Sequence, residues 1–240
     1  MVEMIYRRAR KVNLTKIGQL VNRENFILAG GALCSDSPND YDIFGNGSRF
    51  DIEEIEGRCD STSAEVISKT INALTVKIDG KIVQICSHWK NSMQNLVKSF
   101  DFSHCRAGCL CCFCKCDNAY NPVEAYWEDD FVCAMACGDT KYTGSGEYPI
   151  NTLVRAGKFY KQGKFSSYHS YKISVIQILS DIIKRGLFDA DDVQRQLSAI
   201  SDNIDETDEA QILADILHRD GTPPPRSNEN EITDDDNLPF

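Results

Sequence analysis

The chain has 240 residues, which is long enough for one large domain or for a core with a small appendage. Its formal net charge of −10 argues against a protein whose main role is to bind nucleic-acid backbones. A nucleic-acid substrate is not excluded, because the charge is unevenly distributed along the chain. No apolar run approaches the roughly 18 residues that cross a bilayer, and the first residues lack the apolar segment of a secretory signal. We therefore expect a cytoplasmic protein with no membrane partner.

The first predicted elements are a helix and a strand that ends in two glycines. Residues 13–22 place apolar side chains at helical spacing. Residues 26–29 form an apolar run that is typical of a buried strand, and Gly30 and Gly31 follow it directly. Because glycine has no side chain, a backbone turn of this kind can approach a phosphate group closely.

A second short strand, predicted at residues 40–44, carries two carboxylates separated by one residue. Side chains at positions i and i+2 of a strand point to the same side, so Asp40 and Asp42 are expected to lie together. Two close negative charges repel each other unless a cation lies between them. Mg²⁺, held by carboxylate and phosphate oxygens, resolves that conflict. The glycine pair and the two aspartates together predict a site for a metal-bound nucleoside triphosphate.

The next elements are predicted in this order: a loop at 45–48, a helix at 62–73, strands at 74–78 and 81–86, and a helix at 91–99. The helix at 62–73 has Ser61 or Thr62 as its N-terminal cap, with Glu65 three residues after Thr62. Asp79 and Gly80 separate the two strands, and this dipeptide favours a two-residue hairpin turn.

Eleven cysteines are many for a protein without a secretory signal, and five lie within residues 109–116. A zinc site is one reading, because Cys111 and Cys114 with Cys133 and Cys137 could supply four thiolates. The other reading is a strand buried on both faces in which cysteine serves as a small apolar residue. We expect the structural strand and no zinc site, with another strand near residues 131–134.

After residue 148 the pattern becomes helical. Helices are predicted from Pro149 onward, at 168–184, and more briefly at 190–200 and 208–218. Residues 222–240 contain three consecutive prolines and an acidic run, which is typical of a disordered tail. The predicted class is therefore α+β, a mixed sheet core over residues 1–148 with flanking helices, followed by a helical part at 149–221 and the tail.

Basic residues recur along the first of these C-terminal helices, at positions Arg155, Lys158, Lys161 and Lys164. Set against a triphosphate, Arg155 and Lys158 would neutralise charge and hold a leaving pyrophosphate. The alternative is an ordinary solvated helix face. The four histidines are scattered, and there is no P-loop or dinucleotide-binding glycine motif.

The chain resembles the polymerase-β-type nucleotidyltransferase superfamily in one motif, Leu28-Ala29-Gly30-Gly31-Ala32 followed by Asp40-Tyr41-Asp42. It is most similar to the tRNA nucleotidyltransferase and bacterial poly(A) polymerase branch and to small phage or bacterial relatives. The resemblance implies a nucleotidyltransferase-like core that uses Mg²⁺, with two ions, to move a nucleoside monophosphate from an NTP. The acceptor hydroxyl would belong to an RNA 3′ end, a small molecule or a protein.

The resemblance also implies roles for individual residues. Asp40 and Asp42 would bind metal and serve catalysis, Gly30 and Gly31 would admit the phosphates, and Ser35, Arg155 and Lys158 would assist in binding them.

Two departures stand beside these matches. Leu33-Cys34-Ser35 replaces the usual Val-Arg-Asp, and neutral Gln84 occupies the strand where many members place a third carboxylate. Either the site works with its two carboxylates, or Asp101, with Asp79 as the other candidate, supplies the third. The alternative is a catalytically inactive protein of the same fold that binds protein partners, with the acidic C-terminal region as a docking surface.

Overall fold

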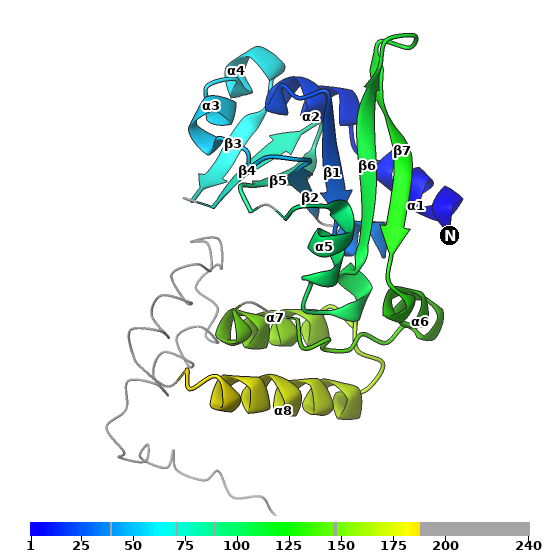
Figure 1. Ribbon diagram of the computed structural model, residues 1–240, viewed down its shortest axis with the longest axis vertical. Helices are drawn as coiled ribbons and strands as arrows, with labels where there is room; N and C mark the ends of the chain where they lie inside the picture. The colour runs from blue at the N-terminus through cyan, green and yellow to red at the C-terminus, as the bar shows by residue number, and fades with distance from the viewer. Residues whose placement is uncertain (39, 71, 89, 146–147, 188–240) are drawn as a thin grey trace, which may run out of the picture. The chain divides into compact units, whose positions relative to one another are not determined.

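A seven-stranded mixed sheet is the centre of the fold. The computed structural model describes residues 1–38, 40–70, 72–88, 90–145 and 148–187. Its strands are β1 (Asn25–Ala29), β2 (Asp40–Gly45), β3 (Glu65–Lys69), β4 (Ala73–Ile78), β5 (Lys81–Cys86), β6 (Ala107–Cys114) and β7 (Ala119–Trp127). Their order across the sheet is β3-β4-β5-β2-β1-β6-β7 (Figure 1). Only β2 and β5 run parallel, and the other neighbouring pairs are antiparallel.

Helices flank the sheet, so the chain belongs to the predicted α+β class. They are α1 (Val2–Ala9), α2 (Leu14–Val21), α3 (Ile52–Glu56), α4 (Cys59–Thr62), α5 (Met93–Lys98), α6 (Asp129–Cys137), α7 (Pro149–Lys161) and α8 (Tyr168–Lys184). Two 3₁₀ turns are η1 (Gly31–Leu33) and η2 (Ser103–Cys105). The helices expected at 13–22, 91–99, from Pro149 and at 168–184 are confirmed as α2, α5, α7 and α8. The sequence patterns did not predict α1 or α3.

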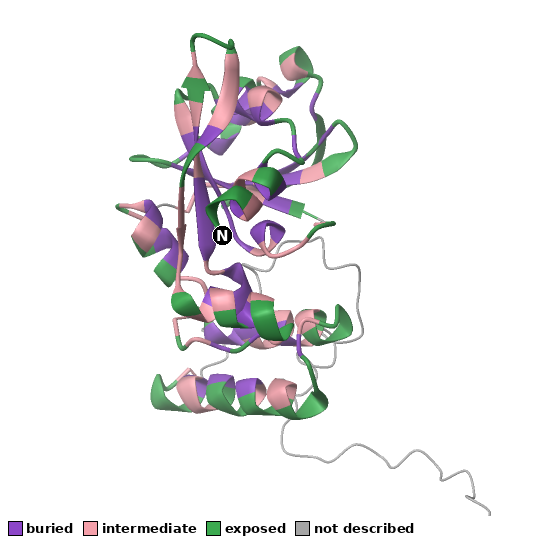
Figure 2. Cartoon of the chain, turned by 90° about the vertical axis from the view of Figure 1, so that its right-hand side faces the viewer, coloured by how far each residue is buried: buried purple, intermediate pink, exposed green. Residues whose placement is uncertain are grey.

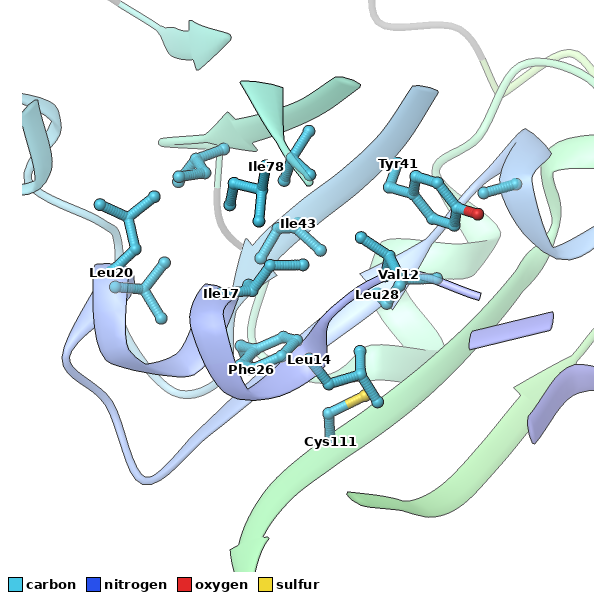
Figure 3. Close-up of a cluster of buried hydrophobic side chains, with 14 of the residues drawn as sticks. Val12, Leu14, Ile17, Leu20, Phe26, Leu28, Tyr41, Ile43, Ile78 and Cys111 are labelled. Atoms are coloured by element: carbon cyan, nitrogen blue, oxygen red, sulfur yellow. The ribbon is translucent and has the colours of Figure 1, made fainter. Parts of the chain in front are cut away.

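The alternation of side chains along the strands separates a large core from a smaller one. On one face, Phe26, Leu28 and Ile43 pack against apolar side chains of α2, as Figure 3 shows. On the other face, β1 and β2 pack against the apolar side of α5 in a separate cluster. Asp40 and Asp42 lie on this second face of β2, because Tyr41 and Ile43 between and beside them point into the large core.

The predicted helix at 62–73 is wrong. The chain instead forms α4, which ends where Ser63 adopts φ 54°, and then enters β3, which pairs antiparallel with β4. β3 is an edge strand in which Val66 and Ile67 are exposed. β-Branched residues favour such a strand, and pairing with β4 outweighs the weak helical pattern.

The strand expected near residues 131–134 is also wrong, because these residues lie inside α6. Phe131 and Ala134 are buried and stand three residues apart, which is the spacing of one helix face. Asp129 and Asp130 occupy the first turn, where carboxylates favour a helix, and Gly138 at φ 61° ends it. Four apolar residues in a row did not distinguish a strand from a short helix.

The hairpin predicted from Asp79 and Gly80 is confirmed between β4 and β5. Both residues have positive φ, 50° and 78°, as the expected turn requires. The helices predicted at 190–200 and 208–218 and the tail at 222–240 lie outside the described residues, and the predicted boundary at residue 148 stays a prediction.

The cysteine-rich strand is confirmed as β6, but it is not buried on both faces, and Phe113 near its end is exposed. Cys109 and Cys111 have no exposed surface, whereas Cys112 and Cys114 are half-buried. Within the described parts of the chain, no group of three or more metal-ligating side chains is arranged to hold an ion. The described helices also include none with the length and apolar composition of a membrane span.

Candidate functional site

The two predicted carboxylates lie at the start of β2. Asp40 is exposed and Asp42 is half-buried, and both point to the same face of the sheet. Asp42 lies opposite Ala29 of β1 and opposite Gln84 of β5. Burial raises the pKa of Asp42 to about 7, and the charge of Asp40 contributes to the rise. The pair therefore carries a charge conflict that protein groups relieve only in part.

The glycine turn lies directly over Asp42. Gly30 has φ +89°, a conformation that side chains rarely adopt, and its amide donates to Ala107 O at 3.1 Å. A Cβ at this position would lie 2.9 Å from Asp42 Oδ2. At Gly31 a Cβ would meet only side-chain atoms, at 3.9 Å and beyond. Gly30 is therefore required both by its backbone conformation and by the close approach of the carboxylate.

A fixed arginine reaches the site from α7. Arg155 Nη1 donates to both oxygens of Asp101, at 2.8 Å and 2.7 Å, and Thr152 Oγ1 donates to Asp101 Oδ2 at 2.9 Å. The guanidinium also lies over the rings of Phe159 and Phe102, at 5.4 Å and 6.0 Å from their centroids. Asp101 is only 4% exposed, whereas the Arg155 side chain is 39% exposed. The charged group is thus held rigidly while part of it stays accessible.

Two cations of α7 lie within electrostatic range of Asp42. Arg155 and Lys158 both oppose the burial that raises the pKa of Asp42, so both lie within electrostatic range of it. They are three residues apart, which places them on one side of α7. Two sequence signals more than 100 positions apart therefore meet at one place.

Ser35 follows the glycine turn, but its hydroxyl has a local partner. Ser35 Oγ accepts a hydrogen bond from the amide of Ser37 at 3.1 Å, which is a common turn arrangement. A contact between Ser35 and a phosphate stays a prediction.

Each candidate for a third carboxylate has a different partner. Asp101 binds Arg155, and Asp79 lies in the β4–β5 turn, where it pairs with Lys16 at 2.5 Å. Gln84 occupies the position beside Asp42 on β5. Within the described residues, therefore, the two aspartates of β2 are not joined by a third ligand. A metal-binding role for Asp101 stays a prediction.

Sequence reasoning missed two residues beneath the glycine turn. His104 is 3% exposed, and its Nδ1 lies 2.6 Å from Thr140 Oγ1. Cys105 Sγ lies 3.4 Å from His104 Nε2, and both residues border Gly31. Burial, with Arg155 and Lys164, lowers the pKa of His104 to about 3, so the ring is neutral. A single histidine without a spaced partner carries no motif, and only its nearness to Asp101 in the chain could have drawn attention.

Comparison with known proteins gives distant structural likenesses only. No family model matches the chain, and no curated protein matches it in sequence. Among solved structures it is similar to a tRNA-processing enzyme in an apo form, at 11% identity and a TM-score of 0.46, over 77% of this chain and 50% of that one. It is also similar to the Thermotoga maritima CCA-adding enzyme complexed with tRNA, at 13% identity and a TM-score of 0.42, over 84% and 48%. A CCA-adding enzyme complexed with CTP matches at 13% identity and a TM-score of 0.44, over 85% and 48%. The chain spans about half the length of these structures.

Proposed function

We propose that this protein is a Mg²⁺-dependent nucleotidyltransferase, which moves a nucleoside monophosphate from an NTP to an acceptor hydroxyl. One observation carries the proposal. Asp40 and Asp42 share one face of β2, the Gly30 turn lies over Asp42, and Arg155, fixed by Asp101, lies within electrostatic range of Asp42. The two carboxylates repel each other and would bind a metal ion, and the fixed arginine beside Asp42 would bind phosphate. Such a site suits a ligand that carries both a metal ion and phosphates.

The donor set fits a hard divalent cation. Asp40 and Asp42 offer only oxygen ligands, and Mg²⁺ is commonly held by one or two carboxylates together with substrate phosphates. The raised pKa of Asp42 means that its carboxyl is partly protonated near neutral pH, so a bound cation would displace that proton. When bound, the metal would supply electrostatic stabilisation of the charge that develops on the phosphates. The expected number of two ions stays a prediction.

The remaining residues would bind and orient the triphosphate. Gly30 and Gly31 would present backbone without side chains to the phosphates beside the carboxylates. Arg155 and Lys158 would hold the departing pyrophosphate, and Asp101 would keep the Arg155 guanidinium aimed at it. Because the arginine is already ordered before substrate arrives, little reorganisation would be needed during the reaction.

A catalytically inactive protein of the same fold is the second candidate. Gln84 beside Asp42 and the pairing of Asp101 with Arg155 favour it, since neither leaves a third carboxylate free. Such a protein would act by binding partners, with the acidic region after residue 187 as the docking surface. The two candidates differ in whether an NTP and Mg²⁺ bind together.

Thermal unfolding with each NTP, with and without Mg²⁺, separates them. At ligand concentrations of about a hundred times Kd, joint binding adds about 2.7 kcal/mol to the free energy of unfolding. For a chain of this size the melting temperature would then rise by roughly 5–10 °C. Asp40→Asn should abolish the joint effect, whereas Asp60→Asn, an exposed aspartate on α4, should leave it intact. Unchanged melting in every combination would support the inactive candidate.

A further inference from the structure

Three tyrosines cluster at the junction of α7 and α8, which pack side by side (Figure 1). We propose that this tyrosine cluster, Tyr160, Tyr168 and Tyr171, together with the lysines around it, binds single-stranded nucleic acid by stacking its bases, and that this strand is the acceptor. The acceptor role rests on the proposed function, whereas the binding itself does not.

The tyrosine rings are arranged as a partly exposed platform. Tyr160 and Tyr171 are stacked, with centroids 4.6 Å apart and planes inclined by 21°. Tyr168 lies 5.9 Å from Tyr160 and 6.1 Å from Tyr171. Tyr160 is 40% exposed and Tyr168 is 58% exposed. Aromatic rings with this much exposed surface are suited to stack against unpaired bases.

The charge around the cluster complements a polyanion. From Tyr148 to Ser180 the chain has one arginine, four lysines and no aspartate or glutamate, within a protein of net charge −10. Lys172 Nζ lies 5.3 Å from the centroid of the Tyr168 ring. Asp139 contacts this segment from outside, and its oxygens accept hydrogen bonds from Ser166 N at 2.8 Å and Ser170 Oγ at 3.0 Å. Asp101 pairs with Arg155 of the same segment, and with both carboxylates counted the five cations still leave a positive charge.

The platform is anchored to the fold beneath it. Phe165 is buried and its ring lies 5.5 Å from that of Tyr171. The Lys164 amide donates to Phe159 O, and Lys164 O accepts from the Thr140 amide, both at 2.9 Å. The side chain of Ser167 caps the start of α8. The outer side of this helix is exposed, as Figure 2 shows. A turn held in this way presents its aromatic rings with little loss of entropy on binding.

The same segment continues to the carboxylate site. Phe159 precedes Tyr160 on α7, and its ring lies 4.4 Å from that of His104, which borders the glycine turn over Asp42. The Arg155 guanidinium lies 5.4 Å from the centroid of the same Phe159 ring. This helix therefore connects the tyrosine cluster with the turn over Asp42. A single strand that stacks on the cluster would have its phosphates beside the cations of this segment and one end directed toward the site.

The test measures binding of a fluorescein-labelled oligouridine, about twelve nucleotides long, by fluorescence anisotropy without NTP or metal. Wild-type protein should bind it more tightly than a duplex of the same length, because a duplex hides the base faces. Tyr160→Ser with Tyr168→Ser should weaken binding roughly tenfold or more, and Tyr160→Phe with Tyr168→Phe should restore it, since stacking needs the ring alone. Circular dichroism and melting curves establish that both double variants are folded.

A salt titration with matched charge variants tests the lysines. Each phosphate contact contributes about 0.7 to the slope of log affinity against log salt for a single strand. Lys172→Gln should lower the slope by about that amount, whereas Lys184→Gln, at the far end of α8, should not. Equal binding of single strand and duplex, or unchanged affinity in the folded serine variant, would overturn the proposal. So would capture of a protein partner by the cluster with no oligonucleotide binding. Absence of strand binding by the wild-type protein, with joint stabilisation by NTP and Mg²⁺ intact, would refute this inference and leave the proposed function standing.

Discussion

Replacing Asp42 by asparagine should make the metal-free protein more stable, although it removes a residue on which the proposed activity depends. In the folded protein, burial and the charge of Asp40 disfavour the ionised form of Asp42. Asparagine has nearly the same shape and no charge, so the variant avoids this cost. Residues that are unfavourable for stability are typical of functional sites.

The size of the effect follows from the pKa. A carboxyl whose pKa changes from 3.8 in the unfolded chain to about 7 in the folded one is penalised by at most about 4 kcal/mol when fully ionised. Asp42 is only half-buried and shares its charge conflict with Asp40, so we expect about 1–2 kcal/mol. The penalty is absent below pH 4, grows as the pH rises from 4 to 7, and is complete above pH 7. The stability gain of the variant should follow the same course.

Urea denaturation in EDTA at pH 5, 6, 7 and 8, for wild type and Asp42→Asn, measures this difference directly. Asp36→Asn is the opposing control. Hydrogen bonding and charge from Arg8 lower the pKa of Asp36, so its ionised form is favoured by folding above its unfolded pKa. That control should therefore show no gain at pH 8. A gain for Asp42→Asn that is the same at pH 5 and pH 8, or a loss of stability at pH 8, would refute the reasoning.

Three further predictions concern Asp101, Gly30 and the cysteines of β6. In urea denaturation, Asp101→Asn should lower the free energy of unfolding by about 1–3 kcal/mol, because it leaves Arg155 without its carboxylate. An unchanged free energy of unfolding would mean that the pair does not order the arginine. Gly30→Ala should be more destabilising than Gly80→Ala in the same assay. Both positions have positive φ, but of these two only Gly30 faces a carboxylate oxygen. Equal losses of unfolding free energy in the two variants would contradict this close approach. Purified protein should contain well under one zinc per chain by elemental analysis, since β6 uses its cysteines for packing, and one tightly bound zinc would contradict this.

Local sequence signals predicted the parts of the fold that local chemistry determines. The turn at Asp79 and Gly80 needs two residues with positive φ, and the dipeptide alone specifies them. The edge strand β3 and the helix α6 were not predicted correctly, because pairing with β4 and packing of Phe131 decide those segments. Weak local patterns yield to tertiary contacts of this kind.

The candidate site shows the same division. Strand geometry predicts that Asp40 and Asp42 lie together. The glycine turn was predicted from Gly30 and Gly31 directly after the apolar run at residues 26–29. The pairing of Asp101 with Arg155 joins residues 54 positions apart, and no spacing rule predicts it. His104 gave no signal either, because its importance comes only from the turn that folds over it.

The central claim is tested most directly by following the label of an NTP. The protein is incubated with Mg²⁺, total cellular RNA or protein, and each NTP labelled on either its α- or its γ-phosphate, with Asp42→Asn as the comparison. Nucleotidyl transfer predicts that the α-label enters the acceptor, that the γ-label leaves as pyrophosphate, and that the variant does neither. Failure of all four α-labelled NTPs to label any acceptor, together with no joint stabilisation by NTP and Mg²⁺, would contradict the account.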